Sequence, residues 1–379
     1  MLRPLGQAAS PPLRLLMTAD AVGGVWTYAL DLARGLGAQG VEVVLAVLGP
    51  APGARQRAEA AAVPGLRLVE TGLALDWTAE DAAAVLAAGI GIATLAREEG
   101  ADLVHLNSPA LAASGAFTQP VVAACHSCVA SWWEAVHGGA LPPDLAWRSA
   151  LVAEGYRAAE RLLAPSAAFA ATTARLYELA EPPHVVHNGR ASRSAAQRPA
   201  RLPERFAFAA GRLWDEGKNL ALLDEIAGRL PLPVVTAGAL AGPQGGTIAL
   251  PNLHNLGPLD SSQMAACFAA ATVFVSPARY EPFGLAVLEA AQAGCPLVLS
   301  DIASFREIWG EAAEYVLCTD GPGFAAAIER LAHDPDLRRQ RGAAAAARAA
   351  RYTPEAMARA TLELYHEALF LSSPQEASA

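Results

Sequence analysis

Two cations and two glycines follow an apolar strand in the segment GRLWDEGKNL and could bind phosphate. The common template is the P-loop, G-x-x-x-x-G-K-[ST], in which backbone amides surround the phosphates and the hydroxyl serves Mg²⁺. This segment departs from the template twice, because five residues separate Gly211 from Gly217 and Asn219 stands where the hydroxyl is required. Arg212 and Lys218 therefore predict a phosphate site of another design.

Two carboxylates stand eight residues apart in the segment RYEPFGLAVLEAAQAGCPLVLSD. The first, Glu281, precedes a turn, and the second, Glu289, lies within a short helix predicted for residues 285–292. A lone glutamate on a helix is usually a solvated side chain. Here every neighbour of Glu289 in LAVLEAAQA is apolar, and burying an ionised carboxylate without a partner is costly.

The start of this helix adds backbone donors to the two carboxylates. The amides of Phe283, Gly284 and Leu285 carry the positive end of the helix dipole and suit a phosphate or sugar hydroxyls. At a rise of ~1.5 Å per residue, Gly284 and Glu289 are about 7.5 Å apart, about the length of a pyrophosphate link. Both carboxylates and the amides could therefore address one ligand.

The composition indicates a soluble globular chain. Its 379 residues suit two domains, hydrophobic residues make up 53%, and no apolar run reaches the ~18 to 20 residues of a membrane span. The N-terminal stretch has no long apolar centre of a secretory signal, so we expect a cytoplasmic protein. The net charge of -9 argues against general nucleic-acid binding.

Short β-branched runs alternate with Ala/Leu-rich stretches, which is typical of parallel strands covered by helices. The polar stretch RASRSAAQRPARLPE predicts a linker between two doubly wound α/β domains, residues 1–195 and 204–352. Thr353 as N-cap and Pro354 at the first helical position predict a last helix over 353–371. A cleft is expected where the carboxyl ends of the strands of both sheets meet.

The chain resembles the retaining glycosyltransferases of family 4, which have the GT-B fold of two Rossmann-like domains. The resemblance rests on the Glu-x7-Glu stretch EPFGLAVLE and its surroundings, and on GRLWDEGKN, HVVHNG, DLVHLNSP, VVAACHS and AVGGVWTYALDLARGL. The family commonly has an Asp shortly after Asn-Gly, where this chain reads NGRAS, and often a Ser in place of Ala278. The resemblance implies an N-terminal acceptor-binding domain, joined by the last helix, and a C-terminal domain that binds a nucleotide sugar.

The resemblance also assigns roles in the C-terminal domain. Arg212 and Lys218 are expected to bind the diphosphate, and Glu289 to hydrogen-bond the ribose. Glu281 is expected near the donor sugar and its phosphate, with the amides of residues 283–285 on sugar hydroxyls.

In the N-terminal domain, the resemblance places His126 near the transferred sugar and lets the loop with Gly23 and Gly24 pass close to both substrates. Taken alone, a histidine that ends a buried strand is usually an ordinary neighbour, and the glycines would also suit a tight turn. Asn188 is expected at the domain junction.

The resemblance implies transfer with retention at the anomeric carbon. No carboxylate stands out as a covalent nucleophile, so we favour same-face attack, with the leaving phosphate taking the proton. No Asp-x-Asp metal motif is evident near the phosphate segments, since the one Asp-x-Asp triplet of the sequence, DPD at 334–336, lies outside them, and Arg212 and Lys218 supply positive charge. We therefore expect no metal and no other cofactor. The resemblance to the family implies a UDP-sugar as the first expected donor and GDP-mannose as the next.

The acceptor is less defined. Trp132, Trp133 and Trp147 lie shortly after His126, in a stretch whose Gly-Gly and Pro-Pro predict a loop. Their aromatic faces suit sugar rings but equally suit packing against the sheet. A saccharide, a lipid-linked sugar and a small metabolite all remain open, with peripheral membrane contact allowed.

Other functions fit the same scaffold less well. They are a non-hydrolysing sugar-nucleotide epimerase, a phosphorylase, for which no cofactor-lysine motif is evident, and a catalytically silent sugar-nucleotide binding protein. An NAD oxidoreductase is disfavoured because no G-x-G-x-x-G follows the first strand of either domain.

Overall fold

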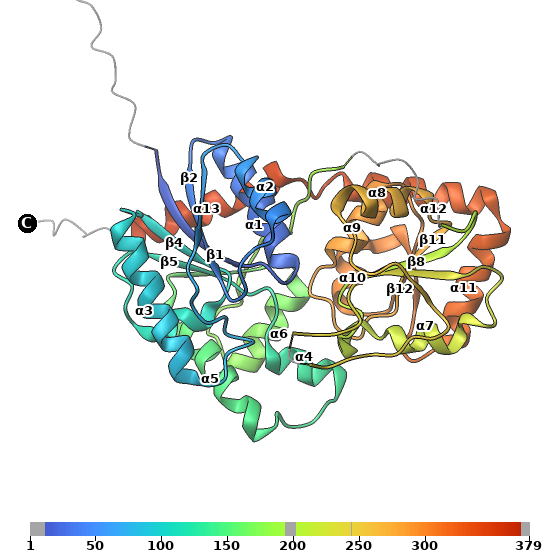
Figure 1. The fold of residues 1–379 in the computed structure, drawn as a ribbon, viewed down its shortest axis with the longest axis horizontal. Coiled ribbons are helices and arrows are strands. Elements are labelled where there is room, and N and C mark those ends of the chain that lie inside the picture. Colours follow the sequence, from blue (N-terminus) through green and yellow to red (C-terminus); the bar gives the residue numbers. More distant parts are fainter. Residues whose placement is uncertain (1–11, 194–201, 244, 373–379) are drawn as a thin grey trace, which may run out of the picture.

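Two parallel sheets, each with helices on both faces, lie side by side in the computed structural model, which describes residues 12–193, 202–243 and 245–372 (Figure 1). The first sheet has the order β3-β2-β1-β4-β5-β6-β7, and all its strands run parallel. Its strands are β1 Arg14–Asp20, β2 Glu42–Leu48, β3 Leu66–Glu70, β4 Leu103–Leu106, β5 Val121–Ala124, β6 Arg161–Ala164 and β7 His184–Val185. Its helices are α1 Gly24–Gly37, α2 Ala54–Ala61, α3 Ala82–Glu98, η1 Pro109–Ser114, α4 Val129–Val136, α5 Pro143–Ala158 and α6 Ala167–Tyr177.

The second sheet repeats this winding with the order β10-β9-β8-β11-β12-β13. Its strands are β8 Ala207–Ala210, β9 Val234–Ala237, β10 His254–Asn255, β11 Val273–Ser276, β12 Leu297–Ser300 and β13 Ala313–Val316. Its helices are η2 Glu216–Lys218, α7 Leu220–Ala227, α8 Ser261–Ala270, α9 Leu285–Gln292, α10 Ala303–Trp309, η3 Gly310–Ala312, α11 Gly321–His333 and α12 Pro335–Ala349. The strand order reverses beside β1 and beside β8, and ligands bind beyond such switch points in open α/β sheets.

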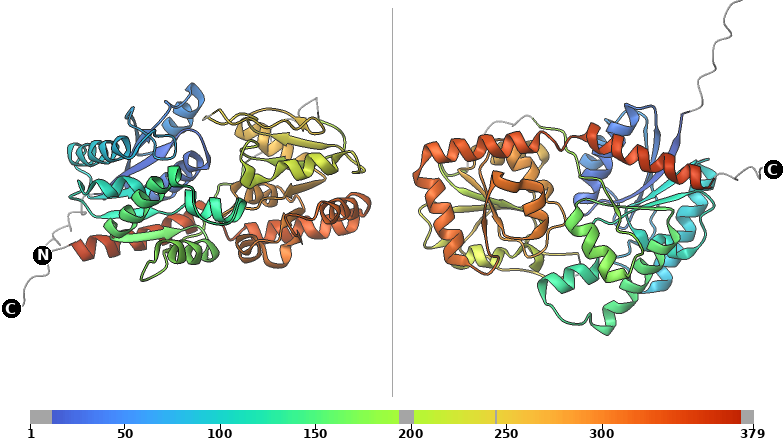
Figure 2. Two further views of the ribbon diagram at one scale, coloured as in Figure 1. Left: turned by 90° about the horizontal axis from the view of Figure 1, so that it is seen from below. Right: turned by 180° about the vertical axis from the view of Figure 1, so that it is seen from behind.

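The last helix, α13 Pro354–Ser372, crosses back to the first sheet, as expected (Figure 2). The Oγ1 of Thr353 accepts the Ala356 amide at 3.2 Å, so the predicted cap is present. One side of α13 is apolar and packs against α1 in the first core, where its residues are buried. They are Met357, Ala358, Leu364, Tyr365 and Ala368.

The chain passes between the domains twice, and the two passages touch. The Arg190 amide donates to the Tyr352 carbonyl at 3.1 Å. A Cβ added to Gly189 would lie 1.9 Å from the Thr353 carbonyl oxygen, so only glycine fits at this close approach. The predicted linker, residues 190–204, includes 194–201, which lie outside the described residues.

Arg190 also joins helices of the two domains through its side chain, which is only 5% exposed. Its Nη1 lies 3.2 Å from Oδ2 of Asp31 on α1, and its Nε lies 2.7 Å from Oε1 of Glu289 on α9. One buried guanidinium therefore neutralises a carboxylate from each domain.

We predict that Arg190→Ala lowers the free energy of unfolding by about 3 to 5 kcal/mol, because it removes the ion pair of Glu289 and leaves the buried Asp31 with only the more exposed Arg34. The matched control is Arg34→Ala, since Arg34 lies 2.8 Å from the same Asp31 but is 40% exposed. An exposed pair of this kind contributes up to about 1 kcal/mol. Urea unfolding followed by tryptophan fluorescence checks the difference, and equal losses in the two variants would contradict it.

Candidate functional site

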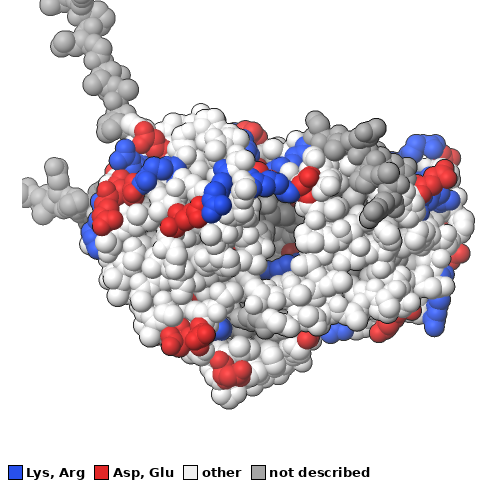
Figure 3. All heavy atoms as spheres, in the orientation of Figure 1, with Lys and Arg blue, Asp and Glu red and all other residues white. Residues whose placement is uncertain are grey.

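The two sheets direct the carboxyl ends of their strands toward a hollow between the domains (Figure 3). The cavity there has a volume of about 740 Å³. Its lining includes Asp20, Gly23, Gly24 and His126 from the first domain and Arg212 from the second. The sequence had placed four of these residues at the site, namely Gly23, Gly24, His126 and Arg212. Other residues that it placed there are not among those that line the cavity: Lys218, Glu281, Phe283, Gly284, Leu285 and Glu289.

The glycine loop after β1 faces the second domain. Asp20 ends the strand, and its Oδ1 accepts the Gly23 amide at 3.0 Å, which fixes the turn that begins α1. A Cβ added to Gly23 would lie 3.8 Å from Arg212 Nη1, and one added to Gly24 would lie 3.5 Å from Leu285 Cδ1. The predicted acceptor-side loop therefore lies directly opposite the predicted donor elements.

The cations of GRLWDEGKNL are held by carboxylates after β8. Arg212 Nη2 lies 2.8 Å from Asp215 Oδ2, and Lys218 Nζ lies 2.5 Å from Glu281 Oε2. Burial favours a higher pKa for Asp215, but Arg212 and Lys218 hold this pKa below its usual value. Asp215 Oδ1 also accepts the Gly217 amide at 2.9 Å, so the carboxylate shapes the turn that carries both cations.

Lys218 is the only lysine in the chain, so arginine supplies every other permanent side-chain cation. A lysine ammonium is a compact point charge, whereas an arginine guanidinium is a wide planar fork. The single lysine of the chain therefore lies beside Glu281, just before the N-terminus of α9.

The start of α9 has the geometry that its sequence predicts. Gly284 has φ 93°, and a Cβ there would lie 3.1 Å from Val287 Cγ2, so the left-handed turn requires glycine. Ser304 Oγ donates to the Glu281 carbonyl at 2.6 Å, and Ser166 Oγ from the first domain donates to the Pro282 carbonyl at 2.7 Å. These bonds position the loop of Glu281 and Phe283 ahead of the helix.

Glu289 lies on α9 with a side chain that is 17% exposed. Burial raises the pKa of its carboxyl, and Arg190 opposes this effect. The sequence indicated that Glu289 needs a partner but did not identify Arg190. The available signal was the arginine after Asn-Gly in NGRAS, at a place where the chain departs from the family pattern.

His126 is part of a hydrogen-bonded network that sequence analysis missed. Its Nε2 lies 2.7 Å from Asn107 Oδ1, and the same oxygen lies 3.1 Å from His105 Nε2. The Tyr365 hydroxyl of α13 lies 2.8 Å from His105 Nδ1. Burial lowers the pKa of His126 to about 3, so its ring is neutral near pH 7.

The loop prediction for the tryptophans was wrong. Trp132 and Trp133 lie on α4 and Trp147 lies on α5, and all three line the cavity. Gly-Gly and Pro-Pro mark only the connection between these helices. Pro143 is the first residue of α5, a position where proline is well tolerated. The Trp132 indole also donates to Asp215 Oδ1 at 3.0 Å, which links α4 to the phosphate element.

Asn188, expected at the domain junction, is buried beside Gly189. It lies in the segment that leads from β7 into the crossing of the two chain passages. Its position fits a role in shaping the junction.

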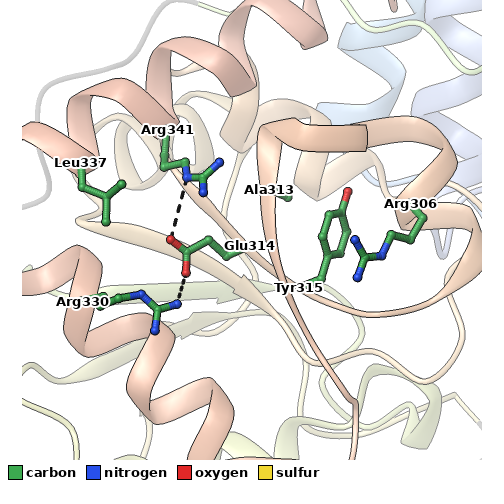
Figure 4. A pocket seen from close by; sticks show the side chains of 7 residues that line it. All are labelled: Arg306, Ala313, Glu314, Tyr315, Arg330, Leu337 and Arg341. Carbon is green, nitrogen blue, oxygen red and sulfur yellow. Dashed lines mark hydrogen bonds and ion pairs between the residues drawn. The ribbon is translucent and has the colours of Figure 1, made fainter.

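A second hollow on the C-terminal domain carries several arginines (Figure 4). There Glu314 is ion-paired to Arg330, and Arg341 Nε lies 3.9 Å from its other oxygen. The Arg306 guanidinium lies 4.0 Å from the ring centre of Tyr315 and pairs with a carboxylate of its own. Because these cations are already partnered, the hollow has no comparable convergence of catalytic groups.

Neither a cluster of metal ligands nor a helix suited to crossing a membrane is found in the part of the chain that the structure describes. No three His, Cys, Asp or Glu side chains there are grouped so that they could hold a metal ion. No helix there is both long and apolar enough to span a membrane.

Comparisons with known proteins match both halves of the chain. Residues 22–191 match the model of Glycosyltransferase Family 4, and residues 249–348 match that of Glycosyl transferases group 1. A D-inositol 3-phosphate glycosyltransferase of Streptomyces scabiei is 30% identical over 94% of this chain and 89% of its own. A glycogen synthase of Mycobacterium tuberculosis is 29% identical over 76% of this chain and 75% of its own.

Solved structures share the fold. Sucrose-phosphate synthase from Thermosynechococcus elongatus has a TM-score of 0.74 at 19% identity, covering 95% of this chain and all of that one. Anabaena HepE in complex with UDP has a TM-score of 0.69 at 17% identity, covering 94% of this chain and all of that one. Together with the matches in sequence, these structures show that the chain has the GT-B fold and belongs to glycosyltransferase family 4.

Proposed function

We propose that this protein is a retaining hexosyltransferase that moves a sugar from a nucleotide diphosphate to a hydroxyl of an acceptor. The observation that carries the proposal is an interdomain cavity lined by His126 and Arg212. Leu285, at the start of α9, lies beside Gly24 of the cavity wall, and Lys218 is ion-paired to Glu281 just before that helix. In this proposal the C-terminal domain binds the donor and the N-terminal domain binds the acceptor.

The diphosphate would lie against Arg212, Lys218 and the first amides of α9. Breaking the anomeric C–O bond leaves growing negative charge on the diphosphate. Preorganised cations stabilise this charge more in the transition state than in the substrate. Asp215 and Glu281 hold the two cations in place through their ion pairs.

Glu289 would bind the ribose through the oxygen that Arg190 does not engage. Glu281 and the amides of residues 283–285 would address the sugar and its phosphate. A UDP-sugar is the favoured donor, in keeping with HepE, which was solved with UDP and with UDP and glucose.

The acceptor hydroxyl would attack from the face that the nucleotide leaves, and the leaving phosphate would take its proton. His126 is neutral near pH 7, because burial lowers its pKa to about 3, so we assign it to positioning the sugar. The closed contacts between the domains would keep water away from the donor.

We predict that the matching nucleoside diphosphate, or its sugar conjugate, raises the melting temperature of the wild type. A ligand held 100-fold above its Kd stabilises the native state by about 2.7 kcal/mol. Glu289→Ala should lose most of this shift relative to its own baseline, because the ribose contact is gone. A thermal-shift titration with UDP, GDP, ADP and their sugar conjugates measures this.

The control for that titration is Glu363→Ala, which removes an exposed carboxylate on α13. It should keep the full ligand-induced shift. A nucleotide shift that survives in Glu289→Ala would overturn the assignment of Glu289 to the ribose.

A second prediction concerns Lys218. We expect Lys218→Met to lower kcat by about 10²- to 10³-fold, the usual cost of removing one preorganised charge-stabilising donor. Lys218→Arg should also lose activity, because the planar fork does not reproduce a compact ammonium beside Glu281. Arg34→Lys, an exposed swap in the opposite direction, is the control, and steady-state release of the nucleoside diphosphate is the readout. Wild-type activity in Lys218→Met would contradict the role.

A third prediction is that transfer continues in EDTA, because Arg212 and Lys218 supply the charge that a metal would bring. The assay compares initial rates with EDTA alone and with added Mg²⁺ or Mn²⁺. Activity that disappears in EDTA and returns with either ion would sink this prediction.

A further inference from the structure

Aromatic rings form a distinct part of the cavity lining. Five tryptophans and a tyrosine reach it from separate segments of both domains. They are Trp77, Trp132, Trp133, Trp147, Trp214 and Tyr280. Aromatic side chains contribute large flat contact areas, and aromatic pairs gain free energy beyond the area that they bury.

Behind these rings the lining is aliphatic. Its members come from β2, α3, α5 and the loop before α3, and most of them belong to the core that packs under the first sheet. They are Leu48, Leu75, Val85, Leu151 and Val152. A sugar needs many hydrogen-bond partners, and these aliphatic side chains offer none. The cavity lining also holds polar side chains, Thr18, Asn107, Ser108 and Ser127.

Apart from Arg212, which we assign to the donor diphosphate, the charged groups of the lining do not favour an anion. Among the described lining residues, the carboxylates are Asp20, Asp76, Asp215 and Glu216, against two guanidinium groups. One of these is Arg212, which is paired with Asp215 and assigned to the donor.

The other guanidinium, Arg148, is committed to the protein. It donates to the carbonyl of Asp76 and, at 2.6 Å, to that of Ala79, and it lies 4.3 Å from the ring centre of Trp147. Burial raises the pKa of Asp76 beside it, and a ligand phosphate would repel this carboxylate whenever it is ionised. Arg148 therefore holds the loop of Asp76 and Ala79 in place. Because Asp76 lies beside it, the pair offers a ligand no net positive charge.

Trp133 adds a specific polar feature. Its indole N–H is buried with no hydrogen-bond partner among the described residues, and its ring centre lies 4.3 Å from that of His137. An indole nitrogen can only donate. A ligand that stacks here and offers one neutral acceptor atom would satisfy it.

We propose that the acceptor is an uncharged hydroxyl compound that carries an apolar ring, and that it is not a phosphorylated sugar. This proposal rests on the proposed function for the transfer step. The ring would lie among the tryptophans, and its hydroxyl would point toward His126 and the donor.

Binding of matched probes to the full chain tests the proposal by calorimetry, with and without the stabilising nucleotide. Phenyl β-D-glucopyranoside should bind about tenfold more tightly than methyl β-D-glucopyranoside, because the aryl ring stacks. D-myo-inositol 3-phosphate should bind no more tightly than myo-inositol. Octyl β-D-glucopyranoside, kept below its micelle concentration, separates a flat ring from an alkyl chain and should bind more weakly than the phenyl compound.

Variants test whether the preference for the phenyl glucoside arises at Trp133. Trp133→Ala should remove the preference for phenyl over methyl, and Trp133→Phe should keep most of it. Phe370→Ala, which removes an aromatic side chain that is 76% exposed on α13, should leave the preference unchanged.

Tighter binding of the phosphate or the octyl probe, or equal binding of phenyl and methyl glucosides to the wild type, would overturn the proposal. The nucleotide thermal shift is measured separately, so the two proposals can fail independently. An aryl preference without any nucleotide shift would support the ring site and count against the transferase. A nucleotide shift without the aryl preference would support the transferase and overturn the ring site.

Discussion

The ion pairs of Arg190 with Asp31 and Glu289 are the constraint on which the geometry of the cleft depends. The Asp31 carboxylate is buried and that of Glu289 is mostly shielded from solvent, so their guanidinium partner must be supplied from within the fold. The backbone of Arg190 is held as well, by the Tyr352 carbonyl and by the Gln292 amide at 2.8 Å. The spacing of α1 and α9, and with it the place of Glu289, therefore follows from one residue at the domain junction.

A second long-range arrangement connects the last helix with the cleft. Tyr365 on α13 contacts His105 on β4, and His105 shares the side-chain oxygen of Asn107 with His126. The Asn107 Nδ2 donates to the Thr18 carbonyl at 2.6 Å, which orients the amide so that its oxygen faces both rings. The return of α13 thus completes the hydrogen bonding behind His126 as well as burying apolar surface.

Local patterns predicted much of the fold. The helix over residues 285–292 and the last helix agree with the structure, because periodicity, caps and turn residues report on them directly. The helices that carry Trp132 and Trp147 were missed, since glycines and prolines in their connection suggested a longer loop. The roles of Arg190 and Asn107 depend on partners far away in the chain, and no local pattern encodes such contacts. The charge balance at the cavity wall could not be predicted for the same reason, because Arg148 and Asp76 come together only in the folded chain.

The close packing of the two chain passages at Gly189 and Thr353 gives the molecule a pivot. Helix α4 lies well away from it, on the lower side of the view in Figure 1. There Trp132 bonds Asp215, and the Ser131 hydroxyl lies 2.8 Å from that of Tyr280. If the domains rotated about this point, the contacts of Trp132 and Ser131 would move apart the most, because they lie farthest from it. The contacts of Arg190 would move the least. Such a rotation would therefore widen the cavity first beside Trp132 and Tyr280, while Glu289 beside Arg190 would hardly move.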